Sequence, residues 1–482
     1  MDLYLLSPEI SLLVVALVVI LLDLLFTKQK WILGAVSLVG LLVPAGFTIS
    51  LWGKYATSLD SALATSFGGA LVIDQFALFF KLFFLVVTAL VILSSIDYSR
   101  KFAAFRGEFY AMLLLATMGM MLMASTRELI SIFVSLELTG ISLYVLAGFL
   151  KDPKSSEAGL KYLLLGAVAS AVLLYGMAMV FGLTGKTHLS EIVQVVSAGG
   201  ISGNTALLTG IVFLIGGFGF KIATVPFQMW VPDVYEGAPT PITAYLSVAS
   251  KAAGFAVILR VFFEALGPAS VDWGMVFAVL AAITMTIGNI VAIAQTNIKR
   301  LLAYSSIAHA GYLMIGLAAA TNTGSSAVVF YLACYAVTNL GAFIAIIAIS
   351  NRIGSDAIAD YSGMAKRSPL LALALALCLI SLTGIPPTAG FMAKLYIFKA
   401  GVDADLIWLV VIGLINTVIA AYYYLRIVKL MYLGEPVSEE RVRSSTSLSV
   451  ALSLACFGVL LLGIYPWLVL KVTETATRLF LP

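Results

Sequence analysis

Apolar segments, each about 20 residues long, run through almost the whole of the 482-residue chain. A helix needs about 20 mainly apolar residues to cross the hydrocarbon core of a bilayer. Hydrophobic residues make up 61% of the chain and charged residues 11%, against about 45–50% and about 25% in soluble proteins. We therefore predict an all-α polytopic membrane protein with fourteen transmembrane helices. Their approximate limits are 9–27, 31–51, 74–97, 108–125, 129–150, 158–183, 205–230, 239–265, 272–294, 299–319, 325–350, 368–400, 405–430 and 447–470.

The first apolar segment is predicted to be a retained span. It has no basic region before it and no small-residue cleavage site after it, and a secretory signal peptide would need both. The longest predicted connections are short, at about 184–204 and 431–446. The sequence therefore predicts no large soluble domain.

Basic residues are unevenly divided between the loops. The odd-numbered loops hold sixteen of them, namely Lys28, Lys30, Arg100, Lys101, Arg106, Lys151, Lys154, Lys299, Arg300, Arg352, Lys366, Arg367, Arg426, Lys429, Arg441 and Arg443. The even-numbered loops hold four, Lys54, Arg127, Lys186 and Lys399. By the positive-inside rule the odd-numbered loops are cytoplasmic, so both termini are predicted on the outer side.

The cysteines and histidines are too few for common redox centres. The three cysteines, Cys334, Cys378 and Cys456, stand alone in apolar runs, whereas an iron–sulfur cluster typically takes about four cysteine ligands. Of the two histidines, His188 falls in a predicted loop and only His309 lies within a span, so a bis-histidine haem site is not expected. We also expect no nucleic-acid binding, because the chain has no basic stripe and no known binding motif.

The seventh and twelfth spans are interrupted by proline and glycine close to a lysine. Lys221 and Pro226 lie in GGFGFKIATVPFQMW, and Lys394 follows Pro386 and Pro387 in SLTGIPPTAGFMAKLYIF. Proline removes a backbone donor and breaks a helix. A lysine at the bilayer centre costs about 2.5–3.5 kcal/mol even on lenient scales, so it indicates a functional site. An ordinary kink is the simpler alternative, and a lysine beside both breaks favours the site.

The two interrupted spans fall in different halves of the chain. The organisation predicted is an N-terminal region (1–107), two five-span units (108–265 and 272–430), and a C-terminal loop and helix (431–482). Since five is an odd number, the second unit would cross the membrane in the opposite sense, as an inverted repeat.

Glu137 is the one acid near the middle of the fifth span, ISIFVSLELTGISLYVLAGF. A nearby ammonium group would keep it charged, and Lys221 and Lys161 are the natural partners. A static ion pair that pins two helices is the structural alternative. Lys161 also has a carboxylate four residues earlier, Glu157, so it could instead belong to a helix pair at the membrane edge.

Two further polar residues lie deep in predicted spans. Lys251 is about twelve residues into the eighth span among small side chains, too deep to reach the interface easily. His309 lies in a polar patch with Ser305, Ser306 and Tyr312; it could be a hydrogen-bonded core residue, but imidazole is also a good proton relay. Lysines without a carboxylate partner bind and release protons more readily when buried. Together these groups predict a proton pathway, with Asp233 and Glu236 capping helices or lining its mouth.

Four segments together resemble the antiporter-like membrane subunits of respiratory complex I. They are KIATVPFQMWVPDVYEGAPTPITAYLSVASK, SLELTGISLYVL, SSIAHAGYL and LTGIPPTAGFMAKLYIF. The resemblance covers nearly the whole chain and is closest to the N type, called subunit 2 in mitochondria. Lys394 argues against the M type, which is expected to carry glutamate there. The chain also lacks the long lateral helix expected of the L type.

The resemblance implies roles in proton transfer. Glu137 matches a glutamate thought to tune the lysine of the seventh span, which Lys221 matches. Lys251, Lys394 and Lys161 match further lysines of the N type, and His309 matches a histidine between two half-channels. The family fold is two inverted five-helix units with discontinuous seventh and twelfth helices.

The resemblance also implies where the chain works and with what. It implies a subunit of NADH:quinone oxidoreductase in the bacterial inner membrane, moving protons while quinone is reduced elsewhere. No cofactor is expected in this chain; NADH, FMN, iron–sulfur clusters and quinone would bind partner subunits. Expected neighbours are an M-type subunit, small K-, J- and A-type subunits, and the lipid bilayer.

Three other functions stay open at this stage. A subunit of a multi-subunit cation/proton antiporter shares the same motifs. A structural spacer that couples other pumps would not need five ionisable groups within its spans. A redox membrane protein would require bound haem.

Overall fold

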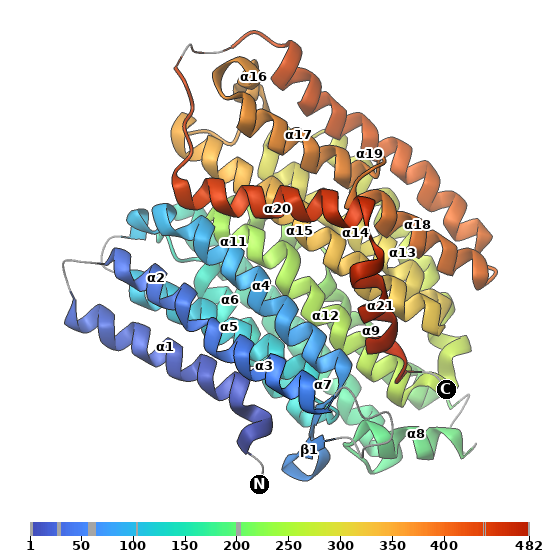
Figure 1. Ribbon diagram of the computed structural model, residues 1–482. Helices are drawn as coiled ribbons and strands as arrows, with labels where there is room; N and C mark the ends of the chain where they lie inside the picture. Colours follow the sequence, from blue (N-terminus) through green and yellow to red (C-terminus); the bar gives the residue numbers. More distant parts are fainter. Residues whose placement is uncertain are drawn as a thin grey trace.

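Most of the long helices lie side by side, with their axes roughly aligned (Figure 1). The computed structural model describes residues 3–26, 30–55, 64–102, 105–198, 204–436, 438 and 440–480. Lys28, one of the basic loop residues, lies outside the described residues. The α-helices are α1 (Ser7–Leu25), α2 (Trp31–Gly40), α3 (Leu42–Tyr55), α4 (Gln75–Tyr98), α5 (Arg106–Ser125), α6 (Leu129–Ala147), α7 (Pro153–Thr184), α8 (Leu189–Ser197), α9 (Thr205–Ile222), α10 (Trp230–Gly237), α11 (Thr240–Tyr245), α12 (Lys251–Ile258), α13 (Ser270–Ile293), α14 (Ile298–Ala319), α15 (Asn322–Ile353), α16 (Met364–Arg367), α17 (Pro369–Thr383), α18 (Ala389–Asp403), α19 (Ile407–Leu433), α20 (Thr446–Ile464) and α21 (Trp467–Thr477).

The remaining elements are short. There are two strands, β1 (Ala64–Ser66) and β2 (Leu71–Ile73), which pair antiparallel with Ala64 opposite Ile73. The 3-10 helices are η1 (Leu3–Leu6), η2 (Phe67–Gly69), η3 (Ser99–Phe102), η6 (Gly267–Ala269) and η7 (Ile358–Tyr361). Two π-helical segments, η4 (Leu246–Ser250) and η5 (Leu259–Ala265), flank α12.

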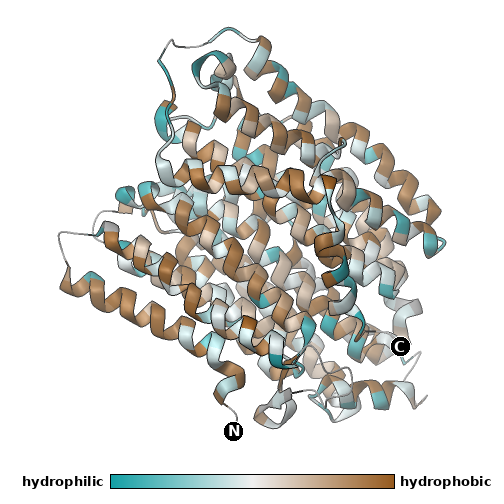
Figure 2. Cartoon of the chain, viewed as in Figure 1, coloured by the Kyte–Doolittle hydropathy of each residue, from teal (hydrophilic) through white to brown (hydrophobic). Residues whose placement is uncertain are grey.

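Among the described residues, thirteen helices are long and apolar enough to cross a membrane. The prediction of an all-helical membrane protein is therefore confirmed, but the predicted count of fourteen exceeds this number by one. The difference lies at 368–400, where α17 and α18 have 15 residues each and neither reaches the required length alone. Figure 2 shows hydrophobic residues along the helices and hydrophilic residues mostly toward the helix ends.

Helix ends coincide with the residues that favour them. Asp74, Asp152, Asn204 and Asn297 each accept a hydrogen bond from a backbone N–H of the first turn of α4, α7, α9 and α14, as helix-capping side chains do. Gly185 ends α7 in the left-handed conformation, which glycine adopts without a steric cost. These local signals account for the starts of these four helices and for the end of α7.

Two helix interruptions lie at the prolines singled out in the sequence. α9 ends at Ile222 and α10 begins only at Trp230, with Pro226 between them. α17 ends at Thr383 and α18 begins at Ala389, with Pro386 and Pro387 between them. Proline cannot donate the backbone hydrogen bond that would continue either helix.

Several small elements fall wholly or partly outside the predicted spans. The hairpin β1–β2 and helix α8 lie in predicted loops, and α21 begins at Trp467, inside the last predicted span, and continues past its predicted end at residue 470. Figure 1 places β1, α8 and both chain termini at the same end of the bundle. The apolar-segment criterion detects only long apolar runs, so it misses such short elements.

Candidate functional site

Lys221 lies in the last turn of α9, next to the helix interruption. Its side chain is buried, and a hydrogen-bonding partner for Nζ is absent among the described protein atoms. Nζ lies 5.6 Å from the centre of the Tyr144 ring, and it approaches Gly140 so closely that a Cβ there would be 3.1 Å away. The negative end of the α9 dipole faces this turn and favours a cation there. The site thus holds a lysine close to the negative end of a helix dipole and to an aromatic ring, with no direct ion pair among the described residues.

Glu137 lies on α6, but it does not form the direct ion pair expected from the sequence. Its carboxylate accepts a hydrogen bond from the hydroxyl of Ser170 on α7. The described residues include no ion pair between Glu137 and either Lys221 or Lys161, although Glu137 is within electrostatic range of Lys221. Ser170 was not predicted, since a single serine in an apolar helix gives no signal of its partner.

Lys161 belongs to a separate cluster of charges. Its Nζ is 2.7 Å from Glu157 and 2.7 Å from Asp233, and its side chain is 42% exposed. The pair with Glu157 is the one expected from their four-residue spacing. Asp233 also binds Arg300, at 2.8 Å. The structure thus places Lys161 among solvent-facing carboxylates, apart from the buried lysines.

The shared carboxylate of this cluster is Asp233. Partial burial alone would raise the pKa of Asp233, but hydrogen bonds and ion pairs with Lys161 and Arg300 outweigh it and hold the pKa below its ordinary value. Asp233 is therefore a stable anion that ties α7, α10 and α14 together.

Lys251 connects the eighth predicted span to α14. The side chain is buried, and Nζ donates hydrogen bonds to the carbonyl of Ser306 at 2.6 Å and to its hydroxyl at 2.9 Å. Lys251 directly follows the π-helical segment η4, and such segments often mark functional sites. Small residues surround it, and a Cβ on Gly254 would lie 2.9 Å from Ile222, so α12 packs closely against α9.

His309 lies on α14, three residues after Ser306. Nδ1 is 2.7 Å from the hydroxyl of Tyr331, and Nε2 is 3.4 Å from that of Tyr424. Both Lys251 and Lys394 are within electrostatic range of the imidazole. The ring is therefore held in the core by tyrosines and lies between the two lysines. The tyrosines were not predicted, because partners on distant helices cannot be read from one segment.

Lys394 lies in the second turn of α18. Its Nζ donates a 2.8 Å hydrogen bond to the carbonyl of Thr383, the last residue of α17. It also lies 4.8 Å from the centre of the Tyr312 ring on α14, within cation–π range. Gly384 has φ +91° and faces this lysine so closely that a Cβ would lie 2.9 Å from its Cδ. The end of α17 thus provides a carbonyl that binds the lysine.

At the first interruption an indole, rather than a lysine, binds a carbonyl at the helix end. The indole Nε1 of Trp230 donates a 3.0 Å hydrogen bond to the carbonyl of Phe220, across the residues that include Pro226. In the second interruption, at Pro386 and Pro387, a lysine takes the equivalent role. A proline break leaves carbonyls without helical partners, and the two sites satisfy them with different donors.

Three of the predicted groups therefore meet along one helix. Ser306, His309 and Tyr312 follow one another at three-residue intervals on α14. Ser306 binds Lys251, the ring of Tyr312 contacts the ring of His309, and Lys394 lies over the Tyr312 ring. Lys221 lies on α9, which packs against α12, and Glu137 lies on α6, whose Gly140 is close to Lys221. Within the described part of the chain, no group of three or more histidine, cysteine or carboxylate side chains could hold a metal ion. The arrangement is suited to proton transfer between side chains.

Comparison with known proteins gives full-length matches. The family described as "NADH:quinone oxidoreductase/Mrp antiporter, TM" matches residues 126–420. The chain is 48% identical to a protein called NADH-quinone oxidoreductase subunit N from Dehalococcoides mccartyi, over 100% of both chains. It is 44% identical to the protein of the same name from Trichlorobacter lovleyi, over 99% of this chain and 97% of the other. A chain in the structure of respiratory complex I from Thermus thermophilus with bound aureothin has a TM-score of 0.81 and 33% identity, covering 96% of this chain and 98% of that one.

Proposed function

This chain belongs to the subunit N family of NADH-quinone oxidoreductase (complex I), and we propose that it carries protons across the membrane along a buried line of side chains. The observation that carries the proposal is the arrangement around α14, where Lys251 binds Ser306 and Lys394 lies over Tyr312, with His309 between them. Buried ionisable groups are costly in a membrane and are therefore usually functional. Lys221 and Glu137 form the other end of the line.

We propose that Glu137 controls the proton affinity of Lys221. In the arrangement described here, Glu137 accepts a hydrogen bond from Ser170 and makes no direct ion pair with Lys221. Rotation of the carboxylate toward Lys221 would favour the charged lysine, and return to Ser170 would favour proton release. Moving one charge against 100 mV costs about 2.3 kcal/mol, which corresponds to a change in proton affinity of about 50-fold. Changes of this size are within reach of buried groups.

From Lys221, protons would pass to Lys251 and then along α14. Ser306 accepts hydrogen bonds from Lys251, and His309 follows one turn later. The imidazole can accept a proton on one nitrogen and donate from the other, and Tyr331 and Tyr424 orient it. Lys394 would receive the proton and release it beyond α18.

The same residues support an inverted repeat with two discontinuous membrane-crossing helices. In this proposal α9 with α10, and α17 with α18, each form one interrupted crossing, in the units 108–265 and 272–430. Regions 1–107 and 431–482 flank the units. Lys221 precedes its break whereas Lys394 follows its break, so the two lysines lie on different halves of their interrupted helices.

We propose that the odd-numbered loops face the cytoplasm and that both termini lie outside. The charge asymmetry of the loops supports this orientation. The location of both termini at one end of the bundle, with β1 and α8, is consistent with it (Figure 1).

The redox chemistry would take place on other subunits of the complex. We propose that NADH, FMN, the iron–sulfur clusters and quinone bind to these partners, and that this chain adjoins an M-type subunit and the small K-, J- and A-type subunits. Conformational change in the complex would then reach Glu137 through neighbouring helices.

The proposal is tested in the assembled complex reconstituted into vesicles. Lys221→Ala, Glu137→Ala and Lys394→Ala are each expected to lower the number of protons moved per electron. The matched control is Glu9→Gln with Lys81→Met, which removes a buried 2.8 Å ion pair away from this line. Normal pumping by Lys221→Ala or Glu137→Ala would contradict the mechanism. A normal proton-to-electron ratio in Lys394→Ala would favour a structural spacer instead.

A further inference from the structure

A charged cavity lies between the two proposed five-helix units, at the end of the bundle that carries the odd-numbered loops. Its volume is about 460 Å³. It is lined by residues from the third, fifth, seventh, ninth and eleventh loops. They include Lys101, Asp152, Ala238, Lys299 and Asp356. It lies apart from the buried line described above, and Lys299 is the most deeply buried of its lysines.

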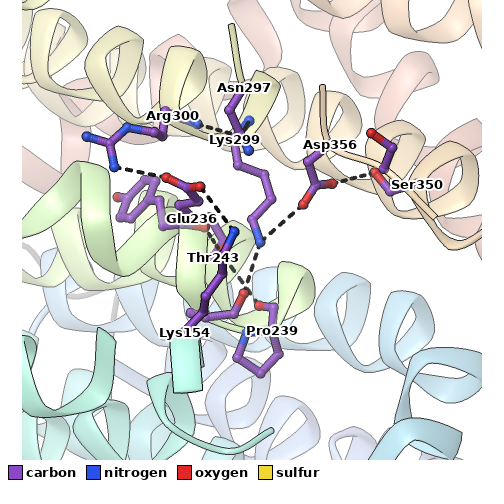
Figure 3. Close-up of polar contacts among 12 residues, drawn as sticks. Lys154, Glu236, Pro239, Thr243, Asn297, Lys299, Arg300, Ser350 and Asp356 are labelled. Atoms are coloured by element: carbon purple, nitrogen blue, oxygen red, sulfur yellow. Dashed lines mark hydrogen bonds and ion pairs between the residues drawn. The ribbon is translucent and has the colours of Figure 1, made fainter. Parts of the chain in front are cut away.

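Lys299 is held at this cavity by oxygen atoms from both units. The loop pattern counts it among loop charges, but the structure leaves it only 4% exposed. Its Nζ donates a 3.2 Å hydrogen bond to the carbonyl of Ala238 and lies 3.7 Å from Asp356. Figure 3 shows the side chain extending from α14 toward Asp356 and the Pro239 region, beside Glu236. Asp356 is partly exposed. Its partly exposed carboxylate therefore contacts the buried ammonium group of Lys299.

Stability of α14 alone does not explain a lysine at this position. Lys299 and Arg300 both lie in the first turn of α14, where the helix dipole disfavours cations. The side chain of Asn297 already caps this turn by accepting from the N–H groups of Lys299 and Arg300. Arg300 is neutralised by Asp233 and Glu236, at 2.8 and 2.9 Å. Among the described carboxylates, Lys299 makes an ion pair with Asp356, at the longer distance of 3.7 Å.

The face of α14 that carries Lys299 leads to Lys251. Ser306 is seven residues further on, which places it on the same side of the helix, about 10 Å along the axis. Ser306 accepts both hydrogen bonds of Lys251. The hydroxyls of Tyr235 and Tyr335 lie close to Ser306, are buried, and have no hydrogen-bonding partner in good geometry among the described groups. Such hydroxyls are the groups that a bridging water molecule uses.

We infer that this cavity is the mouth through which protons reach the line, and that Lys299 is the proton-transfer residue that passes them toward Ser306 and Lys251. The inference rests on the proposed function. It places uptake between the two units at α14, whereas the pathway proposed above begins at Lys221. Asp356 would deliver the proton, and the hydroxyls near Ser306 would carry it onward to Lys251.

Two substitutions separate proton transfer from simple anchoring of α14. Lys299→Arg keeps the positive charge beside Asp356, but arginine does not release its proton in proteins. Proton uptake by the reconstituted complex is expected to fall about tenfold or more in both Lys299→Met and Lys299→Arg. Lys186→Met is the control, since Lys186 is an exposed lysine that pairs with Glu191 at 3.4 Å and does not line this cavity. Normal uptake in Lys299→Arg would show that the lysine only anchors the helix and would overturn the inference.

A chemical rescue keeps the test decisive if Lys299→Arg assembles poorly. Aminoethylation of Lys299→Cys restores a titratable amine, and a trimethylammonium reagent adds a permanent cation. Uptake is expected to recover with the first reagent alone; recovery with both would overturn the inference. Unsubstituted protein, which keeps Cys334, Cys378 and Cys456, controls for labelling elsewhere.

The same preparations distinguish failure of this inference from failure of the proposed function. If Lys221→Ala and Lys394→Ala stop pumping while both Lys299 variants pump normally, the line is correct and the mouth lies elsewhere. If Lys221→Ala and Lys394→Ala also pump normally, the proposed function fails and the inference fails with it.

Discussion

Lys251 and Lys394 contact the same helix, α14, at residues six positions apart. Lys251 donates hydrogen bonds of 2.6 and 2.9 Å to Ser306, and Lys394 lies 4.8 Å from the centre of the Tyr312 ring. These lysines come from different five-helix units of the proposed repeat, 108–265 and 272–430. A single helix therefore supplies the surface that both lysines contact, and His309 lies between their contact points.

The ring of Tyr312 is expected to matter more than its hydroxyl. Tyr312→Phe keeps an aromatic face under Lys394, whereas Tyr312→Leu removes it. Cation–π contacts contribute about 0.5–2 kcal/mol, so Tyr312→Leu is expected to lower proton pumping by about 2- to 30-fold. Pumping is measured in vesicles with the assembled complex, and equal loss in Tyr312→Phe would contradict the role of the ring.

Gly384 is expected to tolerate no side chain. Its φ of +91° disfavours an L-residue, and a Cβ would lie 2.9 Å from Cδ of Lys394. Gly384→Ala is expected to cost about 1–2 kcal/mol and to reduce pumping by displacing Lys394. Both effects are measured, as the melting temperature of the purified protein and as proton uptake. Gly182→Ala is the control, since Gly182 lies within α7 and nothing lies within 4 Å of its Cβ position.

Arg260 is expected to be the buried ion-pair residue whose loss destabilises the fold most. Its side chain is 0% exposed and binds Asp74 at 2.7 Å and Glu264 at 3.0 Å. Removing one partner of a buried ion pair typically costs about 3–5 kcal/mol, so Arg260→Met is expected to lower the melting temperature strongly.

Two comparisons check this result. Arg100→Met removes a pair whose arginine is 75% exposed, and it is expected to change stability by less than about 0.5 kcal/mol. The double variant Arg260→Met, Asp74→Asn is expected to recover part of the loss, because Glu264 keeps its 2.9 Å ion pair with Arg127. An undiminished melting temperature in Arg260→Met would contradict the prediction.

The charge cluster at Asp233 is expected to weaken in acid. Its ion pairs with Lys161 and Arg300 hold the pKa of Asp233 below its ordinary value despite partial burial. A depressed folded-state pKa stabilises the protein above the ordinary value of about 3.9, and this contribution is lost as the pH falls through the folded-state pKa. The melting temperatures of the unsubstituted protein and Asp233→Asn should therefore differ most at neutral pH and converge below about pH 4. Glu435→Gln, at an exposed carboxylate, is expected to show no such convergence.

Burial could be predicted from the sequence much better than pairing. Lys221, Lys251, Lys394 and His309 are buried as their apolar segments indicate, because hydropathy and helix length depend on local composition. The partners of these residues depend on how helices far apart in sequence rotate and pack. The expected direct pair of Glu137 therefore did not appear, and Ser170, Tyr312 and Tyr331 were not identified as partners.

The burial of Lys299, in contrast, could not be predicted from the sequence. A lysine at the end of an apolar segment looks like an ordinary loop charge, and the loop asymmetry counts it so. Its burial follows from the meeting of α14 with the ends of α10 and α15, and nothing in the local sequence predicts that meeting. Glu157 and Lys161 were predictable by contrast, because a four-residue spacing fixes their contact within one helix.

The π-helical segments on either side of α12 bear on how Lys251 can move. Each π-helical turn holds more residues than an α-helical turn. The segments η4 and η5 therefore each contain extra residues, one at either end of the eight-residue helix α12. If one segment tightens to α geometry while the other widens, the residues between them turn about the helix axis by about 100°. The neighbouring parts of the chain would stay in place. Lys251 would then rotate away from Ser306, while the residues before η4 and after η5 keep their positions.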